Sequence, residues 1–319
     1  MATPLVDLRR KAAGADAGFR GVAVVAALAV LAILGLIAIT MGAKSTDVLH
    51  AMGTRLFTSR RWSVPDRVYG AGAFVFGTVL TSLIAVVLSV PVSIGIALFV
   101  TQVVPARLRR PIVYLVDLLA VIPSVVFGLW GISFLAPKIV GVYRWMHDHL
   151  GGIPVLGRLF GPASGSGRSF FTAGIILAIM ITPIITSLSR EVIDTTPPGE
   201  REAALALGAT RWEMIRGAVL PHSKGGLVGA VMLGLGRAMG ETIAVTLTIG
   251  SALGVLGFNL FSSGSSLPSI IIADWGEADA LQKSALIALA MTLFAMTLLV
   301  NFAAVSIVNR SLRRSEGTR

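Results

Sequence analysis

The sequence predicts an all-α membrane protein with six transmembrane helices. Of its 319 residues, 55% are hydrophobic and only 13% are charged, and the mean hydropathy is +0.83. These values are unusual for a soluble domain. Several uncharged runs exceed the roughly 20 residues that a helix needs to cross a hydrocarbon core, whereas the strands of a β-barrel alternate over only about 10 residues. Helical spans are therefore favoured over a barrel.

The expected transmembrane domain covers residues 21–309 and lies between a cytoplasmic N-terminal tail, 1–20, and a cytoplasmic C-terminal tail, 310–319. Its six spans are expected at about 21–43, 72–100, 113–136, 169–189, 226–251 and 284–308. The chain has no cysteine, which excludes a disulfide framework, a thiol nucleophile and a cysteine metal site.

Two apolar stretches contain helix-breaking residues. Pro91 and Pro105 punctuate the long uncharged run around the second span, which predicts a kinked helix with a short extension. The stretch 252–273 is broken by "SSGSSLP", which predicts a short re-entrant or surface segment. We therefore count six spans and not seven.

The placement of the basic residues predicts the orientation of the chain. The net charge is +11. With six spans, 16 of the 27 Lys and Arg residues fall on the side that carries both termini, 10 fall on the opposite side, and Arg237 lies inside a span. Because basic residues are enriched in cytoplasmic loops, both termini are expected in the cytoplasm. Topology accounts for the positive charge, so no nucleic-acid partner is expected.

Arg237 and Glu241 stand inside the fifth apolar stretch, in "GLGRAMGETIAV" (234–245). If this helix begins near Leu227, Arg237 lies roughly 15 Å along it, near the bilayer midplane. Glu241 follows one turn later and is expected on the same face. A charge near the centre of a span costs about 2.5–3.5 kcal/mol, which disfavours contact with lipid. Both side chains are therefore expected to face protein or a water-filled path.

The loop 195–221 predicts two short helices joined by a glycine bend. Thr196 is expected to cap the first helix, whose first turn contains Pro197 and Pro198. Gly208 is a natural C-terminal stop for this helix.

The second helix of the loop is expected to begin with a capping box of Thr210 and Glu213 and to end at Pro221. The small alanines of the first helix suit insertion into a groove on a partner, while a membrane-surface amphipathic hairpin is an equal alternative. A DNA-binding helix-turn-helix is disfavoured, because five basic residues are balanced by five acidic ones between Arg190 and Lys224.

This loop resembles the EAA loop of ABC importer permeases. The match consists of Glu202, Ala203 and Ala204, then Gly208 four residues later, and finally "AVLP" at 218–221. Ala218 stands where the family pattern has isoleucine. The resemblance implies that Glu202, Ala203, Ala204 and Gly208 contact a cytoplasmic ATPase.

Three further segments resemble the PstC-type permease subunit of phosphate ABC transporters. They are "IPSVVFGLWG" (122–131), "ITPIITSLSREV" (181–192) and "MLGLGRAMGETIAV" (232–245), and the similarity covers roughly residues 68–308. The resemblance implies a type I ABC importer permease fold in a bacterial plasma (inner) membrane. It also implies a second permease subunit (PstA-like), two ATPase subunits (PstB-like) and an extracytoplasmic phosphate-binding protein (PstS-like), besides membrane lipid around the spans.

Two interpretations of the charged pair remain open. In the structural one, Arg237 and Glu241 form an i,i+4 ion pair or bind another helix and lock the bundle. In the functional one, they line a translocation path, where the planar guanidinium offers bidentate donors to phosphate. Ionisable residues inside a membrane favour the second interpretation. Phosphate near neutral pH keeps a proton that Glu241 can accept, whereas sulfate has none. The pair is therefore further hypothesised to let phosphate pass and to discourage the passage of sulfate.

The expected function is therefore that of a transport subunit and not of an enzyme. The sequence contains no G-x-x-x-x-G-K-[ST] motif, so ATP hydrolysis is expected in a partner, and no cofactor or metal is expected. One alternative is an ABC importer permease for another oxyanion, molybdate or sulfate. Another is a non-transporting membrane scaffold or sensor. A membrane-embedded hydrolase is disfavoured, because the sequence offers no nucleophile and base at a suitable spacing.

Overall fold

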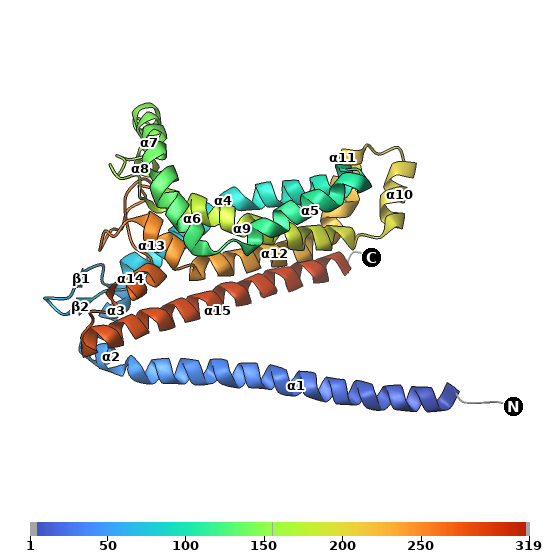
Figure 1. The fold of residues 1–319 in the computed structure, drawn as a ribbon, viewed down its shortest axis with the longest axis horizontal. Helices are drawn as coiled ribbons and strands as arrows, with labels where there is room; N and C mark the ends of the chain where they lie inside the picture. The colour runs from blue at the N-terminus through green and yellow to red at the C-terminus, as the bar shows by residue number, and fades with distance from the viewer. Residues whose placement is uncertain (1–4, 155, 317–319) are drawn as a thin grey trace.

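The computed structural model describes residues 5–154 and 156–316 as a helical bundle with one small β-hairpin (Figure 1). Six of the helices in these ranges are long and apolar enough to cross a membrane. This confirms the predicted all-α class and the number of spans. The six helical stretches are Gly18–Lys44, Gly72–Val103, Ser124–Leu150, Phe170–Asp194, Arg211–Gly240 and Ala280–Ala303.

The first half of the chain begins with α1. The C-terminal end of α1 contacts the rest of the bundle, whereas the earlier part of this helix lies away from the bundle (Figure 1). A short region of two helices and one hairpin follows, and then the two helices α4 and α5. The elements are α1 (Leu5–Lys44), α2 (Thr46–Met52), α3 (Arg55–Thr58), β1 (Trp62–Ser63), β2 (Val68–Tyr69), α4 (Gly72–Leu98) and α5 (Ala106–Val121).

The second half contains the projecting α7, the central α9 and the long C-terminal α15. The elements are α6 (Ser124–Trp130), α7 (Ala136–Leu150), α8 (Leu156–Leu159), α9 (Phe170–Asp194), α10 (Pro198–Ala206), α11 (Arg211–Met214), α12 (Leu220–Gly240), α13 (Ile243–Ile249), α14 (Leu267–Asp274) and α15 (Ala280–Glu316). Three π-helical turns, Phe99–Val103, Gly131–Leu135 and Ile215–Val219, extend or join these helices.

The core of the bundle forms around α9, which packs against α4, α5, α12 and α13. Phe170, Ile181 and Ile185 of α9 are fully buried against Ile84 of α4 and Ile249 of α13. Burying a large aliphatic or aromatic side chain contributes about 1.5–3 kcal/mol in water, whereas between membrane helices close packing supplies the attraction. The core therefore fixes α9 as the element against which the other spans are positioned.

Helix boundaries differ from the expected ones where proline residues occur. The third span was expected as one helix over 113–136, but the backbone at Ile122 and Pro123 is extended, so α5 and α6 are separate helices. The second span keeps Pro91 inside α4 and is extended by the π-helical turn before Pro105, so the expected extension is present. Proline removes one backbone donor, which favours the helix ends before Pro105 and Pro123.

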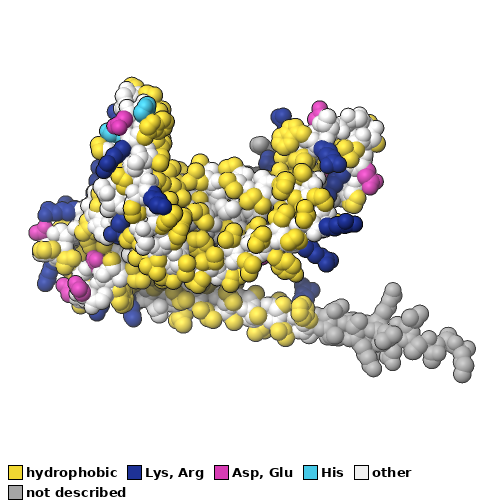
Figure 2. Space-filling view, turned by 45° about the horizontal axis from the view of Figure 1, so that its top comes forward, with side chains coloured by type: hydrophobic (Ala, Val, Ile, Leu, Met, Phe, Trp, Pro, Cys, Tyr) yellow, Lys and Arg dark blue, Asp and Glu magenta, His cyan; other side chains and the backbone are white. Residues whose placement is uncertain are grey.

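The surface shows two charged ends separated by a mostly hydrophobic band (Figure 2). One charged end carries α7, α8 and the hairpin of β1 and β2, and the other carries α10 and α11 (Figures 1 and 2). A band of this kind is what a hydrocarbon core requires. The chain is a multi-pass membrane protein.

Candidate functional site

Arg237 and Glu241 lie on either side of a helix end. The span expected at 226–251 is not one helix, because α12 ends at Gly240 and α13 begins at Ile243. Glu241 has extended backbone angles, φ −70° and ψ 126°, and its carboxylate accepts a hydrogen bond from the N–H of Ala244 at 3.3 Å. The helical phase that would place the two charges on one face therefore ends before Glu241, and no ion pair between them occurs in the described residues.

The depth of Arg237 follows from its neighbours on α12. Gly234 packs so closely against Ile185 that an added Cβ would lie 2.7 Å from that side chain. Ile185 is near the middle of α9, so Arg237, three residues beyond Gly234, lies about 5 Å farther along the bundle. Arg237 is therefore level with the middle of α9, the central span of the bundle.

The Arg237 side chain is exposed on the surface of the single chain. Gly229, Leu233 and Gly240 are also exposed, and with Arg237 they form a stripe along one face of α12. Glu241 is half-buried beyond the end of this stripe. A guanidinium at this depth is disfavoured in contact with lipid, so the stripe requires a polar path or another protein chain beside it.

The loop around Glu202 forms α10 and projects from one end of the bundle (Figure 1). Glu202 and Ala203 are exposed, whereas Ala204 packs against a buried cluster that contains Met214 and Ile215. Gly208 follows the helix with φ +85°, a conformation that side chains other than glycine rarely adopt. The sequence therefore predicted this bend correctly.

Exposed apolar side chains surround these residues. Leu205 is 45% exposed, Leu207 is 90% exposed and Trp212, on α11, is 62% exposed. The backbone groups at the start of α11 are satisfied by the predicted capping box of Thr210 and Glu213. The loop thus presents an ordered apolar knob outside the hydrophobic band, which is typical of a protein interface.

Two expected roles within this loop are wrong. Thr196 does not cap α10, because Pro197 occupies the capping position and the Thr196 hydroxyl lies 3.4 Å from the Ser223 hydroxyl. Pro221 does not end the second helix; it lies in the first turn of α12, directly after the π-helical turn Ile215–Val219. The helix that begins at Arg211 therefore continues through a π-helical turn into the fifth span.

Side chains from the loop anchor α10 to the bundle. Arg201 donates a hydrogen bond from Nη2 to the carbonyl oxygen of Ile193 at 2.8 Å, near the end of α9. His222 Nδ1 lies 3.4 Å from a carboxylate oxygen of Glu200. These contacts position α10 relative to α9 and α12, the two helices that carry the core and Arg237.

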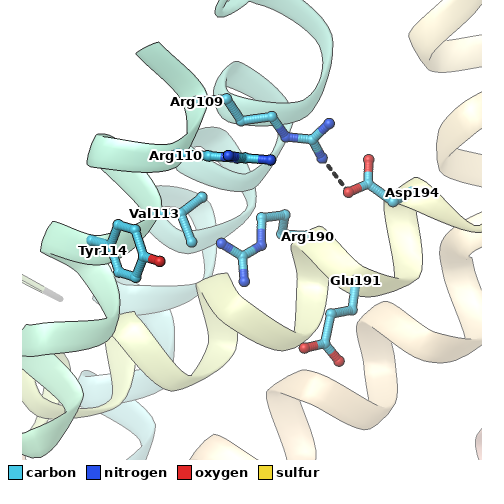
Figure 3. A pocket seen from close by; sticks show the side chains of 7 residues that line it. All are labelled: Arg109, Arg110, Val113, Tyr114, Arg190, Glu191 and Asp194. Atoms are coloured by element: carbon cyan, nitrogen blue, oxygen red, sulfur yellow. Dashed lines mark hydrogen bonds and ion pairs between the residues drawn. The ribbon is translucent and has the colours of Figure 1, made fainter. Parts of the chain in front are cut away.

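A pocket of about 530 Å³ at the same end of the bundle was missed from the sequence (Figure 3). Its lining comes from α5 and α9 and consists of Arg109, Arg110, Val113, Tyr114, Arg190, Glu191 and Asp194. Arg109 pairs with Asp194 across the two helices. In the sequence analysis, these arginines served only to predict the orientation of the chain. The segments "RLRRP" (107–111) and "SREVID" (189–194) nevertheless each contain clustered charges.

Comparison with known proteins agrees with this geometry. Residues 89–314 match the family model described as binding-protein-dependent transport system inner membrane component. Among solved structures, the inward-facing MetNI methionine ABC transporter has a TM-score of 0.55 at 18% identity, covering 78% of this chain and 99% of that one. An alginate ABC importer has a TM-score of 0.50 at 17% identity, with 82% and 88% covered. The fold is that of the type I ABC importer permeases.

Curated relatives are similar over most of their length. The phosphate transport system permease protein PstC of Xylella fastidiosa (strain 9a5c) is 40% identical over 289 residues, which cover 88% of each chain. PstC 2 of Mycobacterium tuberculosis (strain ATCC 25618 / H37Rv) is 44% identical over 276 residues, or 85% of each chain. The chain therefore belongs to the binding-protein-dependent inner membrane components and, within that family, to the PstC permease proteins.

Proposed function

We propose that this chain is the membrane-spanning permease subunit of an ATP-driven phosphate importer, with Arg237 on the translocation path. The observation that carries the proposal is the position of Arg237, an exposed guanidinium level with the middle of α9 and close to a helix end. Its planar donors suit two oxygens of a phosphate. The relatives named phosphate transport permeases support this choice of substrate.

The exposed stripe on α12 also supports a second permease chain beside it. A PstA-like chain would cover the face that Gly229, Leu233 and Arg237 leave open. The conformational change driven by ATP binding would be transmitted through α10. Glu202 and Ala203 of this helix, and Gly208 just after it, would contact a pair of PstB-like ATPases. A PstS-like binding protein would deliver phosphate at the opposite end.

This arrangement places α10 and both termini on the cytoplasmic side. The excess of Lys and Arg on that side supports the orientation. Closure of the ATPases would draw the two coupling loops together and change the side to which Arg237 is open, since only differential binding of ATP to the two conformations can shift their populations.

Glu241 would act on the proton of the substrate. Its carboxylate is half-buried about one helical turn from Arg237 along the chain, at the start of α13. A carboxylate can accept the proton that phosphate retains, whereas sulfate would meet an unpaired negative charge. The pair would thus bind phosphate through Arg237 and discourage sulfate through Glu241.

The test is labelled-phosphate uptake in cells that depend on this subunit. We expect Arg237→Gln to abolish most uptake at unchanged membrane levels, because glutamine removes the charge and the bidentate donors. Arg144→Gln, a matched change at an exposed arginine of α7, should transport normally. Normal uptake by Arg237→Gln would leave Arg237 with a structural role only.

A related oxyanion is the second candidate substrate, because the guanidinium geometry suits any tetrahedral oxyanion. Competition by sulfate and molybdate against labelled phosphate in vesicles that contain the assembled complex separates the candidates. A non-transporting scaffold or sensor predicts no ATP-dependent uptake that requires this chain.

A further inference from the structure

The arginine pocket between α5 and α9 has a net positive lining. Arg109 is paired with Asp194, but neither Arg110 nor Arg190 forms an ion pair among the residues that the structure describes. In Figure 3, the Arg190 side chain extends from α9 toward α5, with the Tyr114 hydroxyl on the same side, whereas the Glu191 carboxylate points away from the arginines. Two guanidinium groups are therefore available to one anionic group.

A separate apolar groove lies farther along the same helices. It has a volume of about 400 Å³ and is lined by Leu88, Val92, Ile96, Val116, Leu119, Ile175, Ala178, Ile179, Thr182 and Pro183, from α4, α5 and α9. At 1.5 Å per residue, Thr182 lies about 12 Å below Arg190 along α9, and Ile179 about 16 Å below it. This distance is close to half of a 30 Å hydrocarbon core, the depth that an acyl chain of one leaflet covers.

We infer that this seam binds an anionic phospholipid, with its phosphate group between Arg110 and Arg190 and one acyl chain in the apolar groove. Basic pockets between membrane helices at the bilayer surface are suited to anionic headgroups. Tyr114 is 68% exposed at the same level, where an amphipathic ring and hydroxyl suit the membrane interface. Free phosphate would use the same guanidinium groups but would leave the groove without an occupant.

The lipid would add a contact between α5 and α9, the helix against which α5 chiefly packs. None of the residues of α5 is buried, and most of its contacts are with α9 and the adjoining π-helical turn. A phosphate held by one arginine from each helix would therefore stabilise the position of α5 against α9. This site lies next to the end of α9, where Arg201 of α10 donates a hydrogen bond to the Ile193 carbonyl.

The experiment is native mass spectrometry of the full chain purified in detergent, titrated with phosphatidylglycerol or phosphatidylcholine of identical acyl chains. We expect the wild type to bind phosphatidylglycerol about ten-fold more strongly, since the quaternary ammonium of phosphatidylcholine offsets the charge of its phosphate and is repelled by the arginines of the pocket. The double variant Arg110→Gln/Arg190→Gln should lose this preference. The matched variant Arg107→Gln/Arg216→Gln removes the same charge at the same end, outside the pocket, and should keep it.

The groove is tested separately by Val92→Trp, which fills it from α4. This variant should bind long-chain phosphatidylglycerol more weakly, while Val87→Trp, exposed on the same helix outside the groove, should not. Because the chain has no cysteine, Val113→Cys accepts a single environment-sensitive fluorophore in the pocket. Its emission should change with phosphatidylglycerol and not with phosphatidylcholine, which provides a readout with both arginines in place.

Four outcomes would overturn the proposal. Equal binding of the two lipids, or full preference in the Arg110→Gln/Arg190→Gln variant, would remove the electrostatic recognition. Displacement of phosphatidylglycerol by excess inorganic phosphate, together with no effect of Val92→Trp, would identify a free-phosphate site. Loss of the preference when the partner permease is co-purified would show that protein covers the seam. None of these readouts depends on transport, so the proposed function can fail or hold independently.

Discussion

The Glu241 carboxylate accepts a hydrogen bond from the backbone N–H of Ala244, and this contact begins α13 directly after the end of α12. Because α12 ends between Arg237 and Glu241, the two residues are not one turn apart on a continuous helix. An acidic side chain that caps a helix is stabilised by the free N–H groups there. Glu241 thus has a structural contact that does not require its charge, in addition to the proposed interaction with the substrate.

We predict that Glu241→Gln separates these two roles. The glutamine oxygen can still accept the hydrogen bond from Ala244, so the start of α13 should be preserved, while the charge is removed. We expect sulfate to begin to compete with labelled phosphate for uptake, and phosphate transport to fall several-fold. Glu277→Gln, at an exposed glutamate outside the spans, should transport like the wild type. Unchanged phosphate uptake and sulfate exclusion at normal membrane levels would contradict the proposed discrimination.

Some features of the fold could be predicted because they depend on composition or local chemistry. Hydrophobic length gives the spans, the capping box gives the start of α11, and Gly208 gives the bend, since each depends on neighbouring residues in the chain. Pro221 was misplaced because proline can end a helix or occupy its first turn, and only tertiary structure decides between these positions.

The helix end at Glu241 and the arginine pocket depend on distant residues. α13 is held by α6, which approaches so closely that a Cβ on Gly128 would lie 3.0 Å from the Ala244 Cα. Arg109 and Asp194 are 85 residues apart in the chain and meet only because α5 packs against α9. Local patterns do not contain such relationships, so the sequence could identify the charged residues but not their arrangement.

Gly208→Ala should weaken coupling without disturbing the spans. A Cβ at this position would meet no atom within 4 Å, but the φ of +85° is unfavourable for alanine by about 1–2 kcal/mol. We expect phosphate-stimulated ATPase activity of the reconstituted complex to fall about five-fold or more. Gly199→Ala, inside α10 and also in open space, has no such strain and is the matched control. Equal activity of both variants would mean that the bend tolerates another conformation.

Arg201→Met should loosen α10 from the bundle. Methionine preserves the apolar part of the side chain but leaves the Ile193 carbonyl without its charged donor, a contact of about 1.5–3 kcal/mol. Limited proteolysis of the purified chain should cut the 195–210 segment about ten-fold faster. Arg211→Met alters an exposed arginine of the same loop and should leave the rate unchanged. Equal rates in the two variants would show that the Arg201 contact does not hold the loop.

Gly77→Ala should destabilise the bundle at the opposite end, where α4 approaches the segment before α14. An added Cβ would lie 2.1 Å from the Ser265 carbonyl oxygen, a backbone atom that cannot move as a flexible side chain can. Overpacking of this kind costs about 1–3 kcal/mol, which for a chain of this size corresponds to a decrease in Tm of several degrees.

The matched control is Gly95→Ala on the same helix, where a Cβ would meet nothing within 4 Å and alanine is the better helix former. Its Tm should equal or exceed that of the wild type, measured by intrinsic tryptophan fluorescence of the detergent-solubilised chain, which has five tryptophans. The 250–266 segment also packs against α13, since the Gly264 N–H donates to the Ile249 carbonyl at 3.1 Å. Uptake by Gly77→Ala should therefore be temperature-sensitive. If the Tm of this variant equalled that of the wild type and its uptake stayed normal at high temperature, the 250–266 segment would be able to move aside without loss of stability.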